Sequence, residues 1–185
     1  MLMEEYLDIL TETGIPTGAS ALKSEVHQKG FYHNTVHIWF YTDSKAILLS
    51  QRSAKKTICP LLWDVSVAGH IDAGESITSA ALRETEEEIG LHISKEDLHK
   101  IGIFPCFQSY DSGLKDNEFH HSFLCKLKVD IDQLQRQEEE VEALKLVSLE
   151  EFQGFIDAID TPNDHLVPSN KAYYQMVLDA IKNIH

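Results

Sequence analysis

The stretch RETEEEIG, residues 83 to 90, limits what this chain can fold into more than any other part of its sequence. It places four glutamates within five positions, just before a glycine of the kind that ends a helix. The helix dipole puts partial negative charge at that end, so each carboxylate there costs from a few tenths to about 1 kcal/mol. Glu84, Glu87 and Glu88 project from one helical face, at i, i+3 and i+4. Arg83 alone cannot neutralise three acids, so something else must compensate them.

The helix that carries these acids is predicted at residues 76–89. Ile77 and the alanines and leucine that follow it recur at helical spacing. Ser76 or Glu75 is placed to cap the start of this helix, and Gly90 is placed to end it. The acidic face therefore lies in the last turns of a helix in the middle of the chain.

Strands are expected on both sides of this helix, because runs rich in branched and aromatic residues are bounded by turn signals. Two hairpins are expected before the helix. The first joins residues 6–10 to the stretch after a turn at 11–18, and the second joins residues 35–41 to residues 46–52. Further strands are expected at residues 63–69, 100–107, 120–129 and 142–147. Two further helices are expected at residues 148–159, where Ser148 and Glu151 form a capping-box pattern, and at 170–184. This order predicts one α/β or α+β domain with a mixed sheet, spanning residues 1–185.

Composition narrows the classes of partner and compartment. The 185 residues are 43% hydrophobic, which suits one globular domain, and the net charge of −14 would repel a nucleic-acid polymer over most of the surface. No apolar run approaches a membrane span, and the acidic start does not resemble a secretory signal. Three cysteines without a CxxC pair favour a reducing compartment. We therefore expect a cytoplasmic protein, and the amphipathic C-terminal segment leaves a homodimer open.

Two interpretations of the three-carboxylate face remain at this point. One is a solvated acidic surface, the usual meaning of a charge run. The other is a site for a hard divalent cation such as Mg²⁺ or Mn²⁺, which binds a few carboxylates together with water and substrate phosphate. The surrounding stretch, GHIDAGESITSAALRETEEEIGL, favours the second interpretation.

This stretch, residues 69–91, resembles the Nudix box, GX5EX7REUXEEXGU with U aliphatic, and hence the Nudix hydrolase superfamily. The single departure is Thr85, which stands where an aliphatic residue is usual. The resemblance implies an α/β/α sandwich with a mixed sheet, in which a loop, helix and loop bind Mg²⁺ or Mn²⁺. It also implies hydrolysis of a diphosphate linked to another moiety, with a small-molecule diphosphate as the partner.

The resemblance assigns metal-binding roles to Glu84, Glu87, Glu88 and the carbonyl of Gly69. Glu84 and Glu87 are then also catalytic candidates, with Glu87 a candidate base.

Three further residues receive roles from the same resemblance. Arg83 would orient the carboxylates or contact phosphate, and Glu75 would brace the loop. A carboxylate from a later loop often acts as base in this superfamily, and Glu140 is the candidate here, with a solvated surface position as its alternative.

A second resemblance covers roughly residues 4–150. HQKGFYHNTVHIWFY, LLSQRSAKKTICPLLWDVSVAGHI and KDNEFHHSF look like the isopentenyl-diphosphate isomerase branch of the superfamily. In that branch histidines and an acid-x-Glu pair form a metal site, and the corresponding residues are His37, either His33 or His27, His70, Asp116 and Glu118. Imidazole with carboxylate suits a transition metal. Arg52 and Lys56 fall where the branch holds its diphosphate, while His120 and His121 are expected to be structural.

Ala68 separates the two activities. The isomerases have a cysteine directly before the GH dipeptide, and Ala68 can neither donate nor accept a proton there. This chain also keeps the REUXEE glutamates that the isomerases lack. The sequence therefore predicts a metal-dependent hydrolase that cleaves a diphosphate linkage in a nucleoside diphosphate derivative or a related small organic diphosphate. An isopentenyl-diphosphate isomerase activity and a non-catalytic diphosphate sensor are the alternatives.

Overall fold

The structure is a computed structural model that describes residues 5–161 and 165–184. The strands are β1 Tyr6–Leu10, β2 Pro16–Leu22, β3 Tyr32–Tyr41, β4 Ile47–Arg52, β5 Trp63–Asp64, β6 Val67–His70, β7 His99–Ser109, β8 Lys115–Lys126 and β9 Val141–Val147. The helices are α1 Lys23–Lys29, α2 Ile77–Ile89, α3 Leu149–Asp157 and α4 Lys171–Lys182, with short 3-10 turns at Lys95–Asp97 and Ile131–Gln133.

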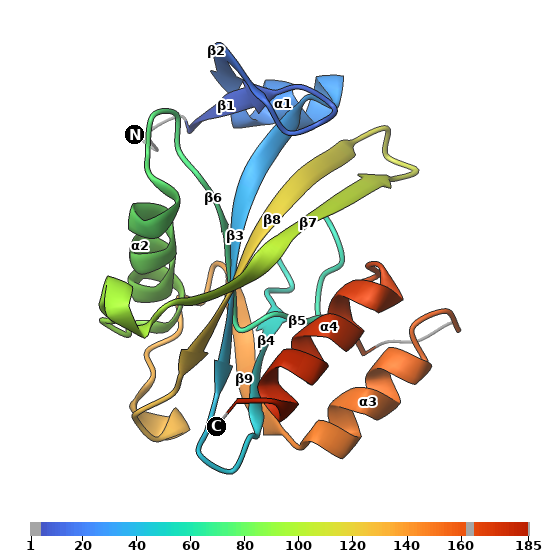
Figure 1. Ribbon diagram of the computed structural model, residues 1–185. Helices are drawn as coiled ribbons and strands as arrows, with labels where there is room; N and C mark the ends of the chain where they lie inside the picture. The colour runs from blue at the N-terminus through green and yellow to red at the C-terminus, as the bar shows by residue number, and fades with distance from the viewer. Residues whose placement is uncertain (1–4, 162–164, 185) are drawn as a thin grey trace.

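The strands form one mixed sheet around β3. This long strand pairs parallel with β8 over its whole length and antiparallel with β6 along one part. β7 continues the sheet beyond β8, whereas β4, β5 and β9 extend it from the other end of β3. The hairpin of β1 and β2 lies with α1 at one end of β3 (Figure 1).

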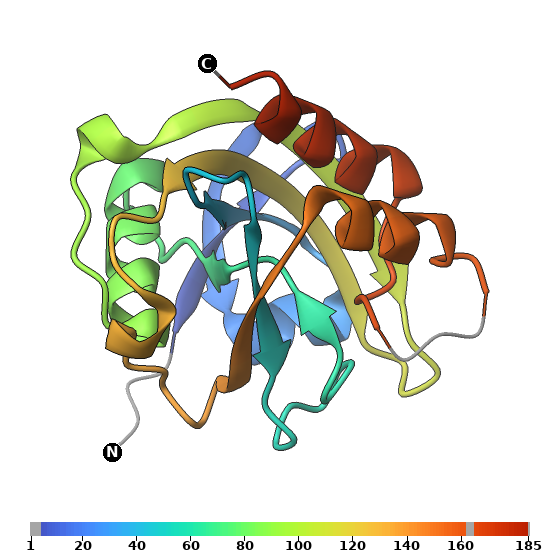
Figure 2. The same cartoon turned by 90° about the horizontal axis from the view of Figure 1, so that it is seen from below.

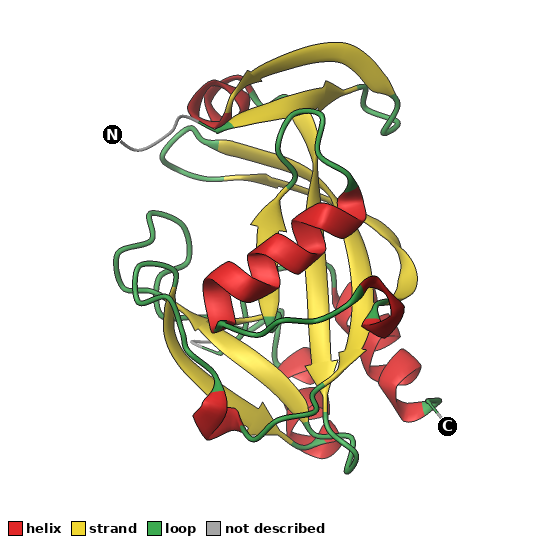
Figure 3. Ribbon diagram, turned by 90° about the vertical axis from the view of Figure 1, so that its left-hand side faces the viewer, coloured by secondary structure: helices red, strands yellow, loops and turns green. Residues whose placement is uncertain are grey.

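Helices cover both faces of the sheet. α2 lies across one face, while α3 and α4 pack together on the other (Figures 1 and 2). Figure 3 shows α2 from its own side, in front of the central strands. Two buried clusters follow from this: Val36, Ile38 and Phe40 of β3 pack toward α2, and Trp39 and Tyr41 pack toward α3 and α4. The predicted α/β/α sandwich with a mixed sheet is confirmed.

The helix that carries the acids begins and ends where the sequence predicts. The Ser76 side chain accepts a hydrogen bond from the backbone N–H of Ser79, and Gly90 ends the helix in the left-handed region at φ 66°. Ser148 caps α3 in the same way, through the N–H of Glu151.

Helix α1 is the element that the sequence analysis missed. It has only seven residues, and Val26 is its single buried residue, so it carries no apolar periodicity to detect. Packing of this turn against β1, β2 and β8 holds it in place. It matters here because it carries His27.

Among the residues that the structure describes, no helix is long and apolar enough to cross a bilayer.

Candidate active site

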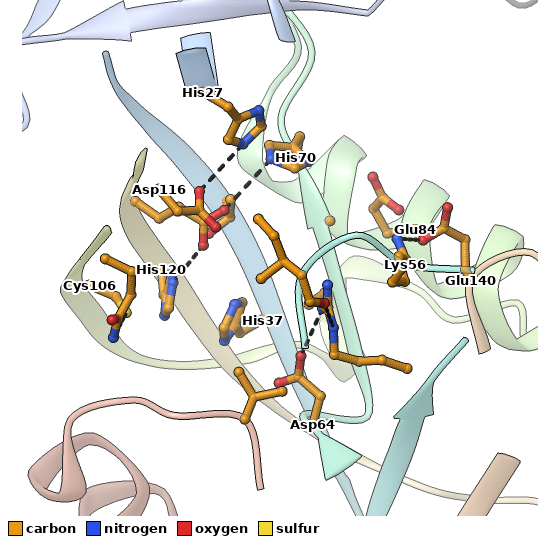
Figure 4. A pocket seen from close by; sticks show the side chains of 18 of the residues that line it. His27, His37, Lys56, Asp64, His70, Glu84, Cys106, Asp116, His120 and Glu140 are labelled. Atoms are coloured by element: carbon orange, nitrogen blue, oxygen red, sulfur yellow. Dashed lines mark hydrogen bonds and ion pairs between the residues drawn. The ribbon is translucent and has the colours of Figure 1, made fainter. Parts of the chain in front are cut away.

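A pocket of about 590 Å³ brings the candidate residues of the sequence together. Its lining comes from α1, α2, β3, β6, β7, β8, the start of α4 with the segment before it, and the stretches that follow β4 and precede β9. In Figure 4 the histidines and Asp116 lie on one side of this pocket, and Lys56, Glu84 and Glu140 lie on the other. All of the predicted site residues except His33 line it. His33 is fully buried directly behind, next to Glu118.

Strand alternation explains how the histidine side is built. Side chains two residues apart on a strand share a face, and paired positions on neighbouring strands point the same way. His33 lies opposite Glu118, and Thr35 lies opposite both His120 on β8 and His70 on β6. Polar side chains from three adjacent strands therefore converge on the α3 and α4 face.

Three histidines gather around the carboxylate of Glu118. Nε2 of His33 and Nε2 of His70 each lie 3.6 Å from Oε1 of Glu118. His27 reaches in from α1, with its Nε2 3.4 Å from Oδ1 of Asp116. Ligand atoms of His27, His33, His70 and Glu118 all lie within 4.8 Å of one another. This group therefore contains both His27 and His33, which the sequence left as alternatives.

The electrostatics of this group fit a cation-binding site. The Asp116 carboxylate, 3.4 Å away, raises the pKa of His27, whereas burial holds the pKa of His70 well below its usual value. Burial and the neighbouring Glu118 raise the pKa of Asp116. The Nε2 atoms of His33 and His70 and Oδ1 of Asp116 are buried without a hydrogen-bond partner. Orphaned imidazole nitrogens beside carboxylates are the donor set expected for a transition ion.

His37 does not join this group, contrary to the set expected from the sequence. It lies four residues beyond His33 on β3, and such a spacing separates two residues by about 13 Å along a strand. His37 instead stacks on His120, with ring centroids 3.8 Å apart, and both approach Glu118. Burial holds the pKa of His37 well below its usual value.

His120, which the sequence analysis treated as structural, lies inside the pocket wall. Its Nε2 is 2.8 Å from Oε2 of Glu118. Burial opposes a charge on His120, but the neighbouring Cys106 and Glu118 side chains outweigh it and raise the pKa of His120 to about 10. The signal was present in the sequence, because Asp116, Glu118 and His120 alternate along one strand and so share a face.

Arg83 supplies part of the counter-charge for the carboxylates of α2. Its guanidinium donates to both oxygens of Glu75, to Glu84, to Glu87 and to the backbone carbonyl of His70. These five contacts use all five N–H groups of an arginine. Arg83 therefore orients the carboxylates and has no N–H left for a phosphate. Glu75 braces the loop as expected, because it also accepts from the N–H of Asp72.

Glu84 and Glu88 lie in the wall of the pocket, where Arg83 pairs with Glu84 and no described cation forms an ion pair with Glu88. Glu88 is only 8% exposed and accepts one backbone hydrogen bond, from Ala68 at 3.3 Å. Burial raises the pKa of Glu88 to about 8 and that of Glu84 to about 7; Glu84 adds to the shift of Glu88, and Glu87 adds to the shift of Glu84. Gly69 lets Glu84 come this close, since a Cβ there would stand 1.9 Å from the Glu84 Cδ.

Glu86 and Glu87 differ in direction, as their helical positions predict. Glu87 lines the pocket and is 52% exposed in its side chain, whereas Glu86 turns away and pairs with His92 at 3.2 Å. The three pocket carboxylates of α2, with the nearby backbone of Gly69, form an oxygen-rich cradle that fits a hard divalent cation.

The basic residues predicted to bind phosphate line the same pocket as this cradle, and Lys56 lies beside Glu84 and Glu140 (Figure 4). Arg52 donates to Asp64 at 3.2 Å and to the Ile58 carbonyl at 3.0 Å. Lys56 forms an ion pair with Glu140, and burial lowers the pKa of Lys56. Asp64 was not anticipated from the sequence, where nothing marks it as a partner of Arg52.

A comparison with known proteins identifies the family to which this site belongs. The NUDIX domain family model matches residues 31–169.

The chain belongs to the Nudix family. The match confirms the predicted family and the predicted enzyme class, a Nudix-type hydrolase, and α2 is the helix of its Nudix box. Nudix hydrolases generally use divalent metal ions, in keeping with the carboxylate cradle on this helix.

Curated relatives support the family and its isomerase-like branch. Nudix hydrolase 3 of Arabidopsis thaliana is 37% identical over 86% of this chain, but the chain spans only 21% of that relative's length. An uncharacterized Nudix hydrolase of Clostridium acetobutylicum is 33% identical over 96% of this chain and 97% of its own. Isopentenyl-diphosphate Delta-isomerase 2 of Photorhabdus laumondii is 32% identical over 66% of this chain and 67% of its own.

Solved structures share the fold. A Deinococcus radiodurans protein superposes with a TM-score of 0.64 at 16% identity, over 96% of this Nudix chain and 98% of its own. The NUDIX domain of Shewanella oneidensis NrtR, complexed with ADP ribose, superposes with a TM-score of 0.57 at 17% identity, over 80% of this chain and 87% of its own.

Proposed function

We propose that this protein is a metal-dependent hydrolase that cleaves a diphosphate linkage in a nucleoside diphosphate derivative or a related small organic diphosphate. The observation that carries the proposal is the gathering of Glu84, Glu87 and Glu88 at the pocket, where Arg83 is the ion-pair partner of Glu84 and Glu87 and buried Glu88 has no ion-pair partner among the described residues. Buried carboxylates with raised pKa values are costly for stability, and such strain is retained at functional sites.

Mg²⁺ or Mn²⁺ is the proposed cofactor. Glu84, Glu87, Glu88 and the Gly69 carbonyl would hold it, because hard cations of this size prefer carboxylate and carbonyl oxygens. When bound, such an ion neutralises phosphate charge and lowers the pKa of water. The close approach of Glu84 to Gly69 supports this assignment, since any side chain at position 69 would fill the cradle.

The remaining residues would orient the substrate and move protons. Arg83 holds Glu84 and Glu87 in place through its two NH1 hydrogen bonds. Arg52 and Lys56 offer positive charge to the diphosphate from the lining of the same pocket. Glu87 and Glu140 are the candidate bases; Glu140 is freed for this role when phosphate replaces it as the partner of Lys56.

A substrate panel with Mg²⁺ tests the proposal, with release of phosphate or monophosphate as the measurement. Glu87→Gln should fold normally, because Glu87 is half exposed, and should lose about 10²-fold or more in kcat. Glu86→Gln is the matched control: it lies on the same helix, faces away and should keep full activity. Unchanged turnover in Glu87→Gln would remove this residue from the mechanism.

Isomerisation of isopentenyl diphosphate is the second candidate, and the group of His27, His33, His70 and Glu118 is the observation that favours it. Ala68 lies at the position that needs a proton donor, so we place this reaction second. Double-bond migration catalysed by the unmodified protein would reverse the order. A sensor would bind the diphosphate without either reaction.

The proposed partner is a small molecule in the cytoplasm. The net charge of −14 disfavours a nucleic-acid polymer. A homodimer is a further proposal, and light scattering of the purified protein measures it directly.

A further inference from the structure

The two oxygens of Glu118 face different sets of histidines. Oε1 is turned toward His33 and His70, at 3.6 Å from each Nε2. Oε2 is turned the other way, 2.8 Å from Nε2 of His120, and ligand atoms of His37, Glu118 and His120 lie within 4.8 Å of one another. One buried carboxylate thus stands between two separate groups of imidazoles, one of which the sequence did not reveal.

Tyr173 engages one ring nitrogen of His37. Nδ1 of His37 lies 2.8 Å from the Tyr173 hydroxyl. The same hydroxyl accepts a hydrogen bond from Trp39 Nε1 at 2.9 Å and lies 3.2 Å from Oγ of Ser122. Nε2, the other ring nitrogen of His37, is therefore the one left to bind an ion.

This arrangement is typical of a metal-binding histidine. A ligating imidazole usually donates its second N–H to an oxygen partner, which fixes both the tautomer and the orientation of the ring. Tyr173 is the oxygen partner of Nδ1 of His37 and orients its ring, and Trp39 and Ser122 hold the hydroxyl itself. His120 has a buried Nδ1 without a hydrogen-bond partner, so only its Nε2 is engaged, with Glu118.

We propose that His37, His120 and Oε2 of Glu118 form a metal site of their own for a first-row divalent transition ion. It shares Glu118 with the group of His27, His33 and His70, so the two sites form a carboxylate-bridged pair. Two imidazoles and one carboxylate are ligands that Zn²⁺, Fe²⁺ and Co²⁺ accept and that Mg²⁺ disfavours. This site therefore differs in metal preference from the carboxylate cradle on α2.

The proposed site is open on one side. His37, Glu118 and His120 all line the pocket, so an ion held by these three residues keeps coordination positions for water or substrate. Three protein ligands with an open position are typical of catalytic rather than structural metal sites. The site does not depend on hydrolysis by the α2 cradle, because none of its ligands comes from that helix.

Titration with Co²⁺ tests the inference, since the ion reports its ligands through visible absorption. Millimolar Mg²⁺ is present throughout to fill the α2 cradle. The wild-type protein should bind two equivalents of Co²⁺, His33→Gln and His37→Gln should each bind one, and Glu118→Gln should weaken both sites. His92→Gln, which removes an exposed histidine paired with Glu86, should still bind two.

The inference is wrong if the wild-type protein binds a single equivalent, or if His37→Gln still binds two. Circular dichroism shows whether each variant is folded. Should His37→Gln fail to fold, anomalous diffraction from wild-type crystals soaked in Co²⁺ decides the matter. Peaks at both histidine groups support the pair of sites, and a peak only beside His33 and His70 overturns it.

Discussion

Replacing Glu88 with glutamine should stabilise the metal-free protein, and the gain should depend on pH. Glu88 is buried, and its pKa is about 8 in the folded state against 4.5 for an ordinary glutamate. Below pH 4.5 the carboxyl is protonated in both states and the residue has no electrostatic cost. As pH rises from 4.5 to 8, the unfolded chain loses its proton and the folded protein keeps it, so stability falls.

The size of the effect follows from the difference between the two pKa values. Each pKa unit corresponds to about 1.36 kcal/mol, so a shift from 4.5 to about 8 corresponds to at most about 5 kcal/mol above pH 8. Glutamine keeps an oxygen for the Ala68 N–H but adds an amide N–H₂ that must find a partner, which offsets about 1 kcal/mol or more. We expect a net gain of about 2 to 4 kcal/mol at pH 9 and almost none at pH 5.

Urea denaturation in EDTA at pH 5, 7 and 9 measures the gain. Glu86→Gln is the control, because Glu86 is exposed and should show no such pH dependence. Adding Mg²⁺ at pH 9 should raise the stability of the wild-type protein more than that of Glu88→Gln, since the ion supplies the missing counter-charge. Equal stability of Glu88→Gln and wild type at pH 9 would refute the reasoning.

Three further substitutions test other parts of the site. Arg83→Lys keeps the charge but not the five hydrogen bonds. Urea denaturation should therefore show a free energy of unfolding lower by about 1 to 2 kcal/mol, and calorimetry should show weaker Mg²⁺ binding. Unchanged stability and Mg²⁺ affinity would contradict the orienting role of Arg83. Gly69→Ala should cost about 1 to 3 kcal/mol and displace Glu84, whereas Gly154→Ala, in open space on α3, should gain about 0.5 to 1 kcal/mol. Ala68→Cys should not create efficient isomerisation of isopentenyl diphosphate, because the neighbouring groups are not tuned for it, and rapid double-bond migration would show otherwise.

Local features of the chain could be predicted from the sequence. The bounds of α2 follow from Ser76, Gly90 and the apolar spacing between them, all of which act within a few residues. The strands follow from alternation and turn signals in the same way. The α2 carboxylates could be singled out because they stand at fixed offsets on one helix.

Long-range pairing could not be predicted. The histidine groups depend on β3 lying parallel to β8, whose residues are more than 80 positions away along the chain, and on the register that sets His33 against Glu118. A short helix without apolar periodicity brought His27 to the site. The sequence grouped His37 with His33 and His70, but β3 separates His33 from His37 by about 13 Å. The partner that orients its ring, Tyr173, lies on the last helix.

Anomalous diffraction from crystals soaked in Mn²⁺ and a non-hydrolysable diphosphate ester tests the central claim most directly. We predict an ion bound by the carboxylates of Glu84, Glu87 and Glu88, with the diphosphate between it and Arg52 and Lys56. A cradle that stays empty at millimolar Mn²⁺, while the protein still hydrolyses diphosphates, would show that these buried acids do not hold the catalytic metal.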